Sequence, residues 1–225
     1  MFWSLGKGID FQCYQKSVTG PDGNPKLLET IYNCEYLGFI DREQKRVGCL
    51  LHPTLHQGVD LRGNSFYGAE LCAGHFCPSY THLTEIEQSA VFAALDDWYL
   101  YGLVITDIDL VKELFTHVQN RLGDSIRPER LKNFKVRTAL QSFFRFKESW
   151  KFASSQNRLG KYYFSHCEYQ IARIEYEKRW KIKPSHFDKI LVSLSSEFEN
   201  QKDVLEAEFL IVEKFEEFIE AYLVP

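Results

Sequence analysis

The 225-residue chain lacks several features that would place it in a class at once. No stretch approaches the roughly 20 apolar residues that a membrane-spanning helix needs. The N-terminal sequence MFWSLGKGIDFQC has no basic start followed by an apolar run and a cleavage site, so we expect no secretory signal. The net charge is −4, so overall charge favours neither nucleic acid nor an anionic membrane as a partner. We therefore expect a cytoplasmic protein that does not bind membranes.

The motifs of several enzyme classes are also missing. Gly6-Lys7-Gly8 does not have the spacing of a phosphate-binding glycine loop. Neither the G-x-S-x-G turn of serine hydrolases nor an H-E-x-x-H zinc motif occurs in the chain. The sequence therefore gives no reaction, and it favours a protein that is not an enzyme.

What the chain does have is six cysteines, five of them before residue 83. In a reducing cytoplasm disulfides are disfavoured, so clustered thiols indicate metal ligands or redox groups. The cluster spans three short segments, YNC34EYLG, VGC49LLH52P and ELC72AGH75FC77P. Several ligands must converge within about 2.3 Å of a metal ion, and close pairs of thiols and imidazoles next to turn-forming residues favour such convergence.

The simplest four-ligand set is Cys34, Cys49, Cys72 and Cys77. His52 is the first alternative ligand and His75 the second, because zinc accepts four thiolates or three thiolates and an imidazole. An iron–sulfur cluster would favour the four thiolates. No Cys-x2-Cys pair is present, and isolated cysteines are commonly buried as small hydrophobic side chains. We predict a zinc site, with an iron–sulfur cluster on the same cysteines as the alternative.

This arrangement resembles a bacterial cysteine-cluster family whose members are described as zinc- or iron-chelating proteins. The resemblance rests on Cys34-x2-Leu37, on Gly48-Cys49-Leu50-Leu51-His52-Pro53, and on Cys72 and Cys77 followed by Pro78. It covers residues 34–78, and it departs from the family in that only Cys13 precedes Cys34. The resemblance implies metal binding and implies no reaction.

The chain changes character near residue 83, which predicts two domains. Residues 1–82 contain most of the glycines and only short apolar runs, as expected of a loop-rich metal-binding module with short strands. The polar residues 41–46 separate two such runs, 36–40 and 47–51, and could close a hairpin. Residues 83–225 are predicted to form a helical bundle, so the expected fold class is mainly α.

Several helices are expected after residue 83. Thr84-Glu85-Ile86-Glu87 has the form of a capping box and predicts a helix to about Tyr101, interrupted by Gly102. Further helices are expected from Thr106 or Asp107 to Gly123, from Pro128 towards Ser155, over roughly 164–181, and within 185–223. The last is predicted to carry one apolar stripe, made of Leu205, Phe209, Val212, Phe215, Ile219 and Tyr222.

Charge gives two further predictions. Residues 127–161 contain ten basic and two acidic residues with aromatic residues between them, which permits nucleic-acid binding through phosphates and stacking. The favoured interpretation is an amphipathic segment with an aromatic core face that packs beside the acidic residues 197–220. Asp60 and Arg62, within the cysteine cluster, are expected to form a loop-stabilising ion pair rather than an anion site.

Together these observations favour a zinc-binding scaffold or interaction protein whose helical domain contacts a protein partner. Folding and metal binding would be coupled, because the loops of the module have too few apolar residues to fold alone. The alternatives are an iron–sulfur redox or sensing protein, a metalloenzyme with an open coordination position beside His52 or His75, and a nucleic-acid-binding protein.

Overall fold

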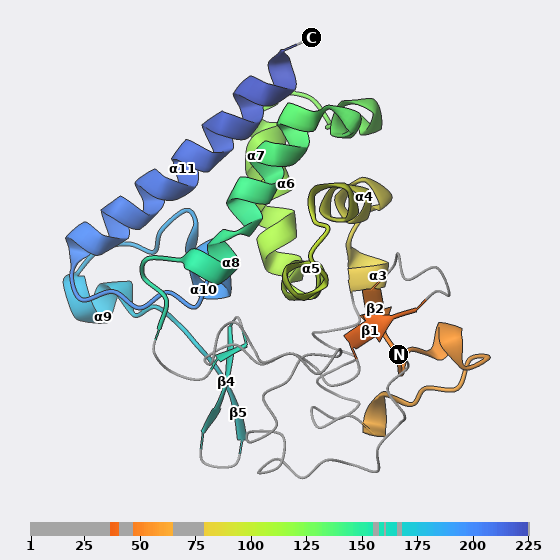
Figure 1. Ribbon diagram of the computed structural model, residues 1–225. Coiled ribbons are helices and arrows are strands. Elements are labelled where there is room, and N and C mark those ends of the chain that lie inside the picture. Colours follow the sequence, from red (N-terminus) through yellow and green to blue (C-terminus); the bar gives the residue numbers. More distant parts are fainter. Residues whose placement is uncertain are drawn as a thin grey trace.

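The computed structural model describes residues 37–40, 47–64, 79–154, 158–159, 161–165 and 168–224. Within these residues the chain is mainly helical and several helices pack together, as predicted (Figure 1). The helices are α3 (Ser79–His82), α4 (Glu85–Ala94), α5 (Trp98–Ile105), α6 (Ile108–Leu122), α7 (Phe134–Phe144), α8 (Phe146–Ser149), α9 (Tyr176–Trp180), α10 (Asp188–Ser193) and α11 (Gln201–Leu223). Short 3-10 helices cover Pro53–Leu55, Arg62–Asn64 and Pro128–Lys132.

The described strands form two small antiparallel sheets. In the first, β1 (Leu37–Phe39) pairs with β2 (Val47–Cys49), which confirms the predicted hairpin. The second has the order β3 (Arg158–Leu159), β4 (Tyr162–Ser165), β5 (Glu168–Ile171). This sheet corrects the prediction of a helix over 164–181, of which only α9 is helical. Tyr162, Tyr163 and Phe164 have high strand propensity, and they pair with residues of β5 that follow only a few positions later.

The helices after residue 83 begin largely where their capping residues predict. Thr84 accepts a hydrogen bond from the Glu87 amide, and the Glu87 carboxylate accepts one from the Thr84 amide, which confirms the capping box. Asp107 caps α6 through the Leu110 amide (3.1 Å), and Gly123 ends α6 in the left-handed conformation at φ 67°. A residue without a Cβ adopts that conformation at little cost.

One predicted helix is divided at a different point. The helix from Thr84 does not continue to Tyr101, because Leu95 takes an extended conformation and α4 ends at Ala94. The Asp97 carboxylate then accepts a hydrogen bond from the Leu100 amide (2.7 Å) and caps α5. Gly102, the predicted break, lies buried inside α5. The boundary between α4 and α5 is therefore set by the capping residue Asp97 and not by Gly102.

The basic segment also differs from the single helix predicted from Pro128 towards Ser155. It contains the 3-10 helix Pro128–Lys132, then α7 and α8. Its aromatic residues face the core, as the favoured interpretation predicted: Phe143, Phe144 and Trp150 are buried. Phe146 and Phe152 pack against the core in part, and Phe134 is exposed. Most of the aromatic side chains are therefore not placed for stacking on bases.

The last segment forms two helices, and its apolar residues divide between two faces of α11. Phe215, Ile219 and Tyr222 are buried, whereas Leu205, Phe209 and Val212 are exposed. The prediction of one stripe was wrong because Val204, Ala207 and Ile211 take the buried positions in the first half of α11. A spacing of three or four residues permits two parallel rows on one helix, and burial alone distinguishes them.

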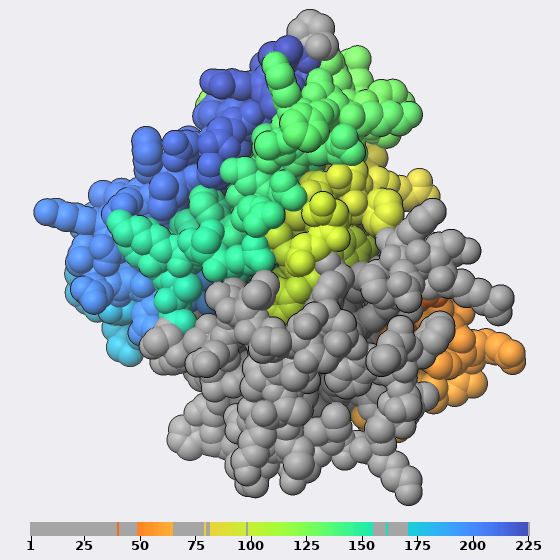
Figure 2. Space-filling model, viewed as in Figure 1, coloured from red at the N-terminus to blue at the C-terminus, as the bar shows by residue number. Residues whose placement is uncertain are grey.

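The core lies between α4, α6, α7, α10 and α11. Helix α7 packs against both α4 and α11, and α6 packs against α10 and α11. The ring centroids of Phe143 in α7 and Phe215 in α11 lie 5.5 Å apart. The acidic α11 therefore lies beside the basic segment, as predicted, and Figure 2 shows it along an outer edge of the molecule. Among the described helices, none has the length and hydropathy that crossing a bilayer requires.

Candidate functional site

Two of the five predicted metal ligands lie within the described residues. Cys49 ends β2, and the His52 amide donates a hydrogen bond to the Cys49 carbonyl oxygen (3.2 Å), so the chain turns tightly between them. Cys34, Cys72 and Cys77 lie outside the described residues, as do Cys13, His75 and Cys167. Among the residues that the structure describes, no group of three or more candidate ligands is placed to hold a metal ion. The ligand set therefore remains a prediction.

His52 is positioned by its neighbours in the loop after β2. Its Nδ1 lies 2.8 Å from the Thr54 hydroxyl and accepts a hydrogen bond from the Thr54 amide at 3.3 Å. The pKa of His52 is lowered from its ordinary value by partial burial and by the positive charge of Arg62. Both effects favour the neutral imidazole, which is the form that binds a metal ion.

The Asp60–Arg62 pair has the role that the sequence favoured. Two hydrogen bonds join the side chains, from Arg62 Nε to Asp60 Oδ1 (2.8 Å) and from Nη2 to Oδ2 (2.6 Å). These bonds lower the pKa of Asp60 to about 2. A guanidinium already held at both ends by a carboxylate is poorly suited to capture another anion, so the pair stabilises the loop.

The predicted module and the helical body are in contact. Leu51, directly after β2, is completely buried, and β2 packs against α5. His56 Nε2 lies 2.6 Å from the Leu50 carbonyl oxygen, which fixes the loop around Leu51. The boundary near residue 83 remains a prediction, but the first hairpin is anchored to the helices rather than tethered to them by a linker.

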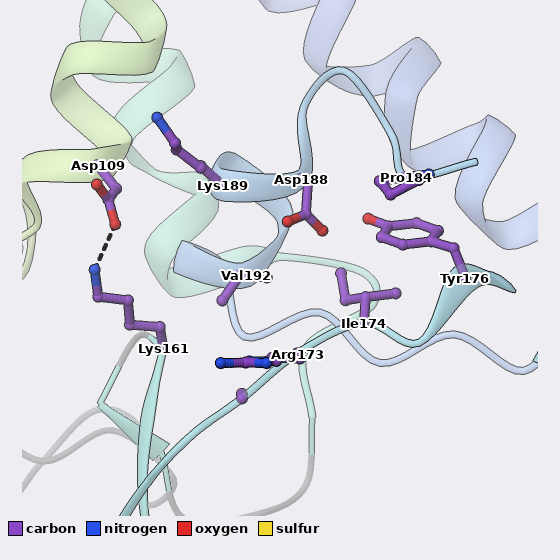
Figure 3. Close-up of a pocket in the computed structure, with 10 residues that line it drawn as sticks. Asp109, Lys161, Arg173, Ile174, Tyr176, Pro184, Asp188, Lys189 and Val192 are labelled. Carbon is purple, nitrogen blue, oxygen red and sulfur yellow. Dashed lines mark hydrogen bonds and ion pairs between the residues drawn. The ribbon is translucent and has the colours of Figure 1, made fainter. Parts of the chain in front are cut away.

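A second candidate site was not predicted from the sequence. It is a pocket of about 300 Å³ where the start of α6, the start of α10, the end of β5 and the start of α9 meet (Figure 3). The pocket combines basic, acidic, phenolic and apolar side chains. They are Asp109, Lys161, Ala172, Arg173, Ile174, Tyr176, Pro184, Asp188, Lys189 and Val192.

The pocket has more basic than acidic side chains. Lys161 Nζ lies 2.5 Å from Asp109 Oδ2, and Lys189 Nζ lies 2.6 Å from Oε1 of Glu113, a residue of α6. Arg173 is exposed and forms no ion pair with a described residue. Burial raises the pKa of Asp188. Three basic and two acidic side chains thus line the pocket, and Arg173 is the cation that forms no ion pair with a described residue.

Two buried polar atoms of the pocket residues make no hydrogen bond of normal geometry to any described residue, although they interact with each other. Tyr176 is only 2% exposed, yet its hydroxyl has no hydrogen-bond partner of normal geometry among the described residues. The same holds for Oδ1 of Asp188, which lies across from the Tyr176 ring in Figure 3. Burial and the nearby Asp188 carboxylate both raise the pKa of Tyr176, so the phenol stays protonated. An unpaired buried hydroxyl costs about 1–3 kcal/mol of folding free energy, so its presence needs a reason.

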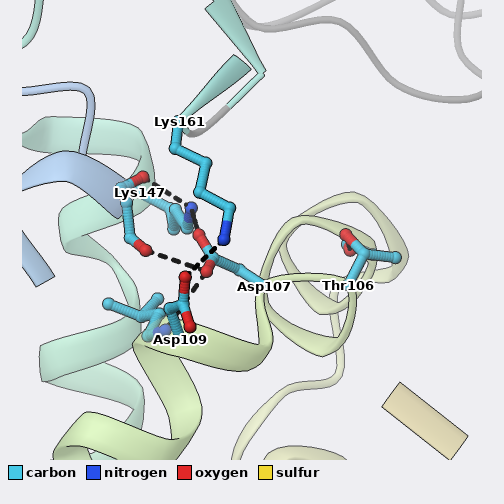
Figure 4. Close-up of polar contacts among 8 residues, drawn as sticks. Thr106, Asp107, Asp109, Lys147 and Lys161 are labelled. Carbon is cyan, nitrogen blue, oxygen red and sulfur yellow. Dashed lines mark hydrogen bonds and ion pairs between the residues drawn. The ribbon is translucent and has the colours of Figure 1, made fainter. Parts of the chain in front are cut away.

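A buried ion-pair network adjoins the pocket at the start of α6 (Figure 4). Lys147 is 9% exposed, and its Nζ donates to Asp107 Oδ2 (2.5 Å) and to the Ser193 carbonyl oxygen (2.8 Å). The Ser193 hydroxyl donates to Asp107 Oδ1 (2.9 Å). Asp107 caps α6, as its place in the sequence predicted, and Asp109 lies in the first turn of the same helix. Their lysine partners could not be predicted, because Lys147 and Lys161 lie 40 and 52 residues further along the chain.

The chain matches no protein-family model and has no significant match among curated proteins or solved structures. Its function is therefore argued from its own residues.

The first prediction concerns the buried Lys147–Asp107 pair. Lys147→Met should lower the free energy of unfolding by about 3 kcal/mol, because it leaves a buried carboxylate without its partner. Adding Asp107→Asn should recover part of this loss, since asparagine still caps α6 but carries no charge. Urea denaturation of both single variants and the double variant measures the coupling between the two side chains.

Lys151→Met provides the matched control for this cycle. Lys151 pairs with Glu206 at the surface, where such pairs contribute about 0–1 kcal/mol, so its loss should be small. Equal effects of the Lys147 and Lys151 substitutions would contradict the role given to the buried network.

The second prediction concerns the hydroxyl of Tyr176. Tyr176→Phe should leave the free energy of unfolding unchanged or raise it by about 1 kcal/mol, because it removes a buried hydroxyl that has no partner. Tyr222→Phe is the control: the Tyr222 hydroxyl accepts a hydrogen bond from the Arg127 amide (2.9 Å), and its removal should destabilise the fold. A loss of stability in Tyr176→Phe as large as that in Tyr222→Phe would show that the Tyr176 hydroxyl is paired in solution.

Proposed function

We propose that this chain is a non-enzymatic interaction protein. In this proposal, residues 34–77 bind zinc in a structural role and the helical body presents the surface for a protein partner. The observation that carries the proposal is a row of exposed apolar side chains on α11, which no described residue covers.

The apolar row consists of Leu205, Phe209 and Val212, with exposed fractions of 56%, 67% and 39%. Their spacing of four and three residues places them on one face of α11, opposite buried residues such as Ile211 and Phe218. Single exposed apolar residues are ordinary, whereas an aligned row indicates an interaction surface. Helix α11 can therefore be held in the core by one face and offer the other to a partner.

Charge indicates what kind of partner the apolar row would bind. Helix α11 contains seven acidic residues and two lysines. Glu206 and Glu216 are paired with Lys151 and Arg121, whereas Glu213 and Glu220 are exposed beside the row. A second copy of α11 would bring like charges together, which disfavours a dimer through this face. We therefore propose an amphipathic helix with apolar residues at matching spacing and basic residues beside them.

The proposed zinc site is supported by the part of the module that the structure describes. Cys49 and His52 are brought together by a tight turn, and the neutral form of His52 is favoured. The anchoring of β2 against α5 would let a metal ion fix the surrounding loops against the helical body. The cysteines have no assigned reaction, so a closed structural site requires the fewest assumptions. An iron–sulfur cluster on the same thiolates remains the alternative.

The third prediction tests the metal. The purified full chain should contain about one zinc ion, and Cys49→Ser and Cys77→Ser should each lose most of it, because each variant removes one of the four predicted thiolate ligands. Cys167→Ser, outside the predicted set, should retain the metal. Elemental analysis and visible absorbance of anaerobically purified protein measure this. Full metal content in both variants would contradict the predicted ligand set. Iron with acid-labile sulfide would contradict the zinc site and support the iron–sulfur cluster.

The fourth prediction tests the apolar row with a designed peptide. A helix of about 18 residues, or five turns, with leucines at the matching spacing and lysines beside them should bind the full chain. Phe209→Ser should weaken binding at least tenfold, about 1.4 kcal/mol, because a central aromatic residue dominates such contacts. Fluorescence anisotropy of the labelled peptide measures the affinity.

Two controls distinguish this contact from general adhesion. Phe92→Ser changes an equally apolar residue of α4 that is 49% exposed, and it should leave the affinity unchanged. A peptide with glutamates in place of lysines should not bind. Equal losses of peptide affinity in Phe92→Ser and Phe209→Ser, or binding of the acidic peptide, would contradict the proposal. Self-association of the chain that depends on Phe209 would show that the row binds a second copy instead.

A further inference from the structure

We infer that the pocket between α6, α9, α10 and β5 binds a small phosphate monoester that carries a free hydroxyl group. Arg173 would contact the phosphate, and Tyr176 and Asp188 would contact the hydroxyl. This inference is independent of the zinc site and of the apolar row on α11, because it shares no residue with either.

The basic side of the pocket favours a doubly charged anion. Three basic side chains line it, from three separate segments of the chain: Lys161 before β4, Arg173 after β5 and Lys189 in α10. Asp109 and Glu113 each offset one lysine, which leaves the guanidinium of Arg173 exposed and without an ion-pair partner among described residues. A guanidinium binds a phosphate through two parallel hydrogen bonds. The electrostatic attraction of Lys161 and Lys189 would also be stronger for a phosphate dianion than for a singly charged carboxylate.

The other side of the pocket is built for a neutral polar group. In Figure 3, Tyr176 and Asp188 lie across the pocket from Lys161 and Arg173. The Tyr176 hydroxyl can donate a hydrogen bond and Asp188 Oδ1 can accept one; the two groups interact with each other, but neither makes a hydrogen bond of normal geometry to a described residue. A ligand hydroxyl placed between them could accept from Tyr176 and donate to Asp188. One such group would give both buried atoms a well-aligned partner.

The space between these two sides fits a small molecule. The volume of about 300 Å³ is at the lower end of ligand pockets, which run from about 300 to 1,000 Å³. Ile174 and Val192 form apolar walls between the charged and the phenolic side. A short carbon chain with a phosphate at one end and a hydroxyl at the other therefore matches the pocket in charge, in polarity and in size.

Isothermal titration calorimetry of the full chain tests this inference with four probes: inorganic phosphate, glycerol 3-phosphate, glycerol and glycerate. Glycerol 3-phosphate should bind at least tenfold more tightly than phosphate, and glycerol should not bind. Arg173→Gln should weaken both phosphate probes at least tenfold. Tyr176→Phe should reduce the affinity for glycerol 3-phosphate to that for phosphate, and it should leave the affinity for phosphate unchanged. Loss of a residue with a purely structural role would weaken the binding of both probes.

Arg179→Gln is the matched control, because Arg179 is exposed on the neighbouring α9, stacks on Trp180 and does not line the pocket. It should bind both phosphate probes like the wild type. Circular dichroism confirms that each variant is folded. The inference would be overturned if neither phosphate probe binds the wild type, if Arg173→Gln and Arg179→Gln lose affinity equally, or if glycerate, the carboxylate counterpart, binds more tightly than glycerol 3-phosphate. Equal affinities of the wild type for phosphate and glycerol 3-phosphate would contradict the proposed contact between Tyr176 and the ligand hydroxyl.

Discussion

The buried amine of Lys147 joins three helices that the sequence keeps far apart. Its two acceptors are Asp107 at the start of α6 and the Ser193 carbonyl oxygen at the end of α10. Asp107 also caps α6, so one carboxylate both begins a helix and neutralises a buried charge. Because removal of either partner leaves a charge without compensation in a poorly solvated site, the three helix ends are fixed relative to one another. The pocket depends on this arrangement, since Asp109, Asp188 and Lys189 project from those same helices.

Capping signals in the sequence predicted helix ends correctly, whereas periodicity did not distinguish strands from helices or buried faces from exposed ones. The capping box at Thr84 and the left-handed Gly123 were predicted correctly, because each depends on residues within one or two turns. Asp97 is a cap of the same kind, accepting a hydrogen bond from the Leu100 amide, and Gly102 lies inside the helix that Asp97 begins. The strands near Tyr162 were missed because aromatic residues fit both a strand and a buried helix face. In α11, periodicity alone did not distinguish the core residue Phe215 from the exposed Phe209.

The two candidate sites differ in the same way. The metal site was predicted from close spacings, such as Cys49 to His52, and the structure shows that this spacing forms a tight turn. The pocket left no such trace, because its residues are spread from Asp109 to Val192 and each is unremarkable by itself. Only the folded chain brings the segment of Arg173 and Tyr176 against Asp109 and Lys189. A site can be predicted from the sequence when its ligands are close together in the chain, and it cannot when tertiary packing brings distant residues together.

The unpaired hydroxyl of Tyr176 bears on how this chain has been selected. Phenylalanine has nearly the same shape, and one nucleotide substitution in either tyrosine codon produces it. Selection for folding stability alone would favour that replacement, because the phenol loses its hydration on burial and makes no hydrogen bond of normal geometry with a described residue. Natural proteins give up stability where another property is under selection. If the proposed pocket binds its ligand, the cost of burying the tyrosine at position 176 is offset by that binding.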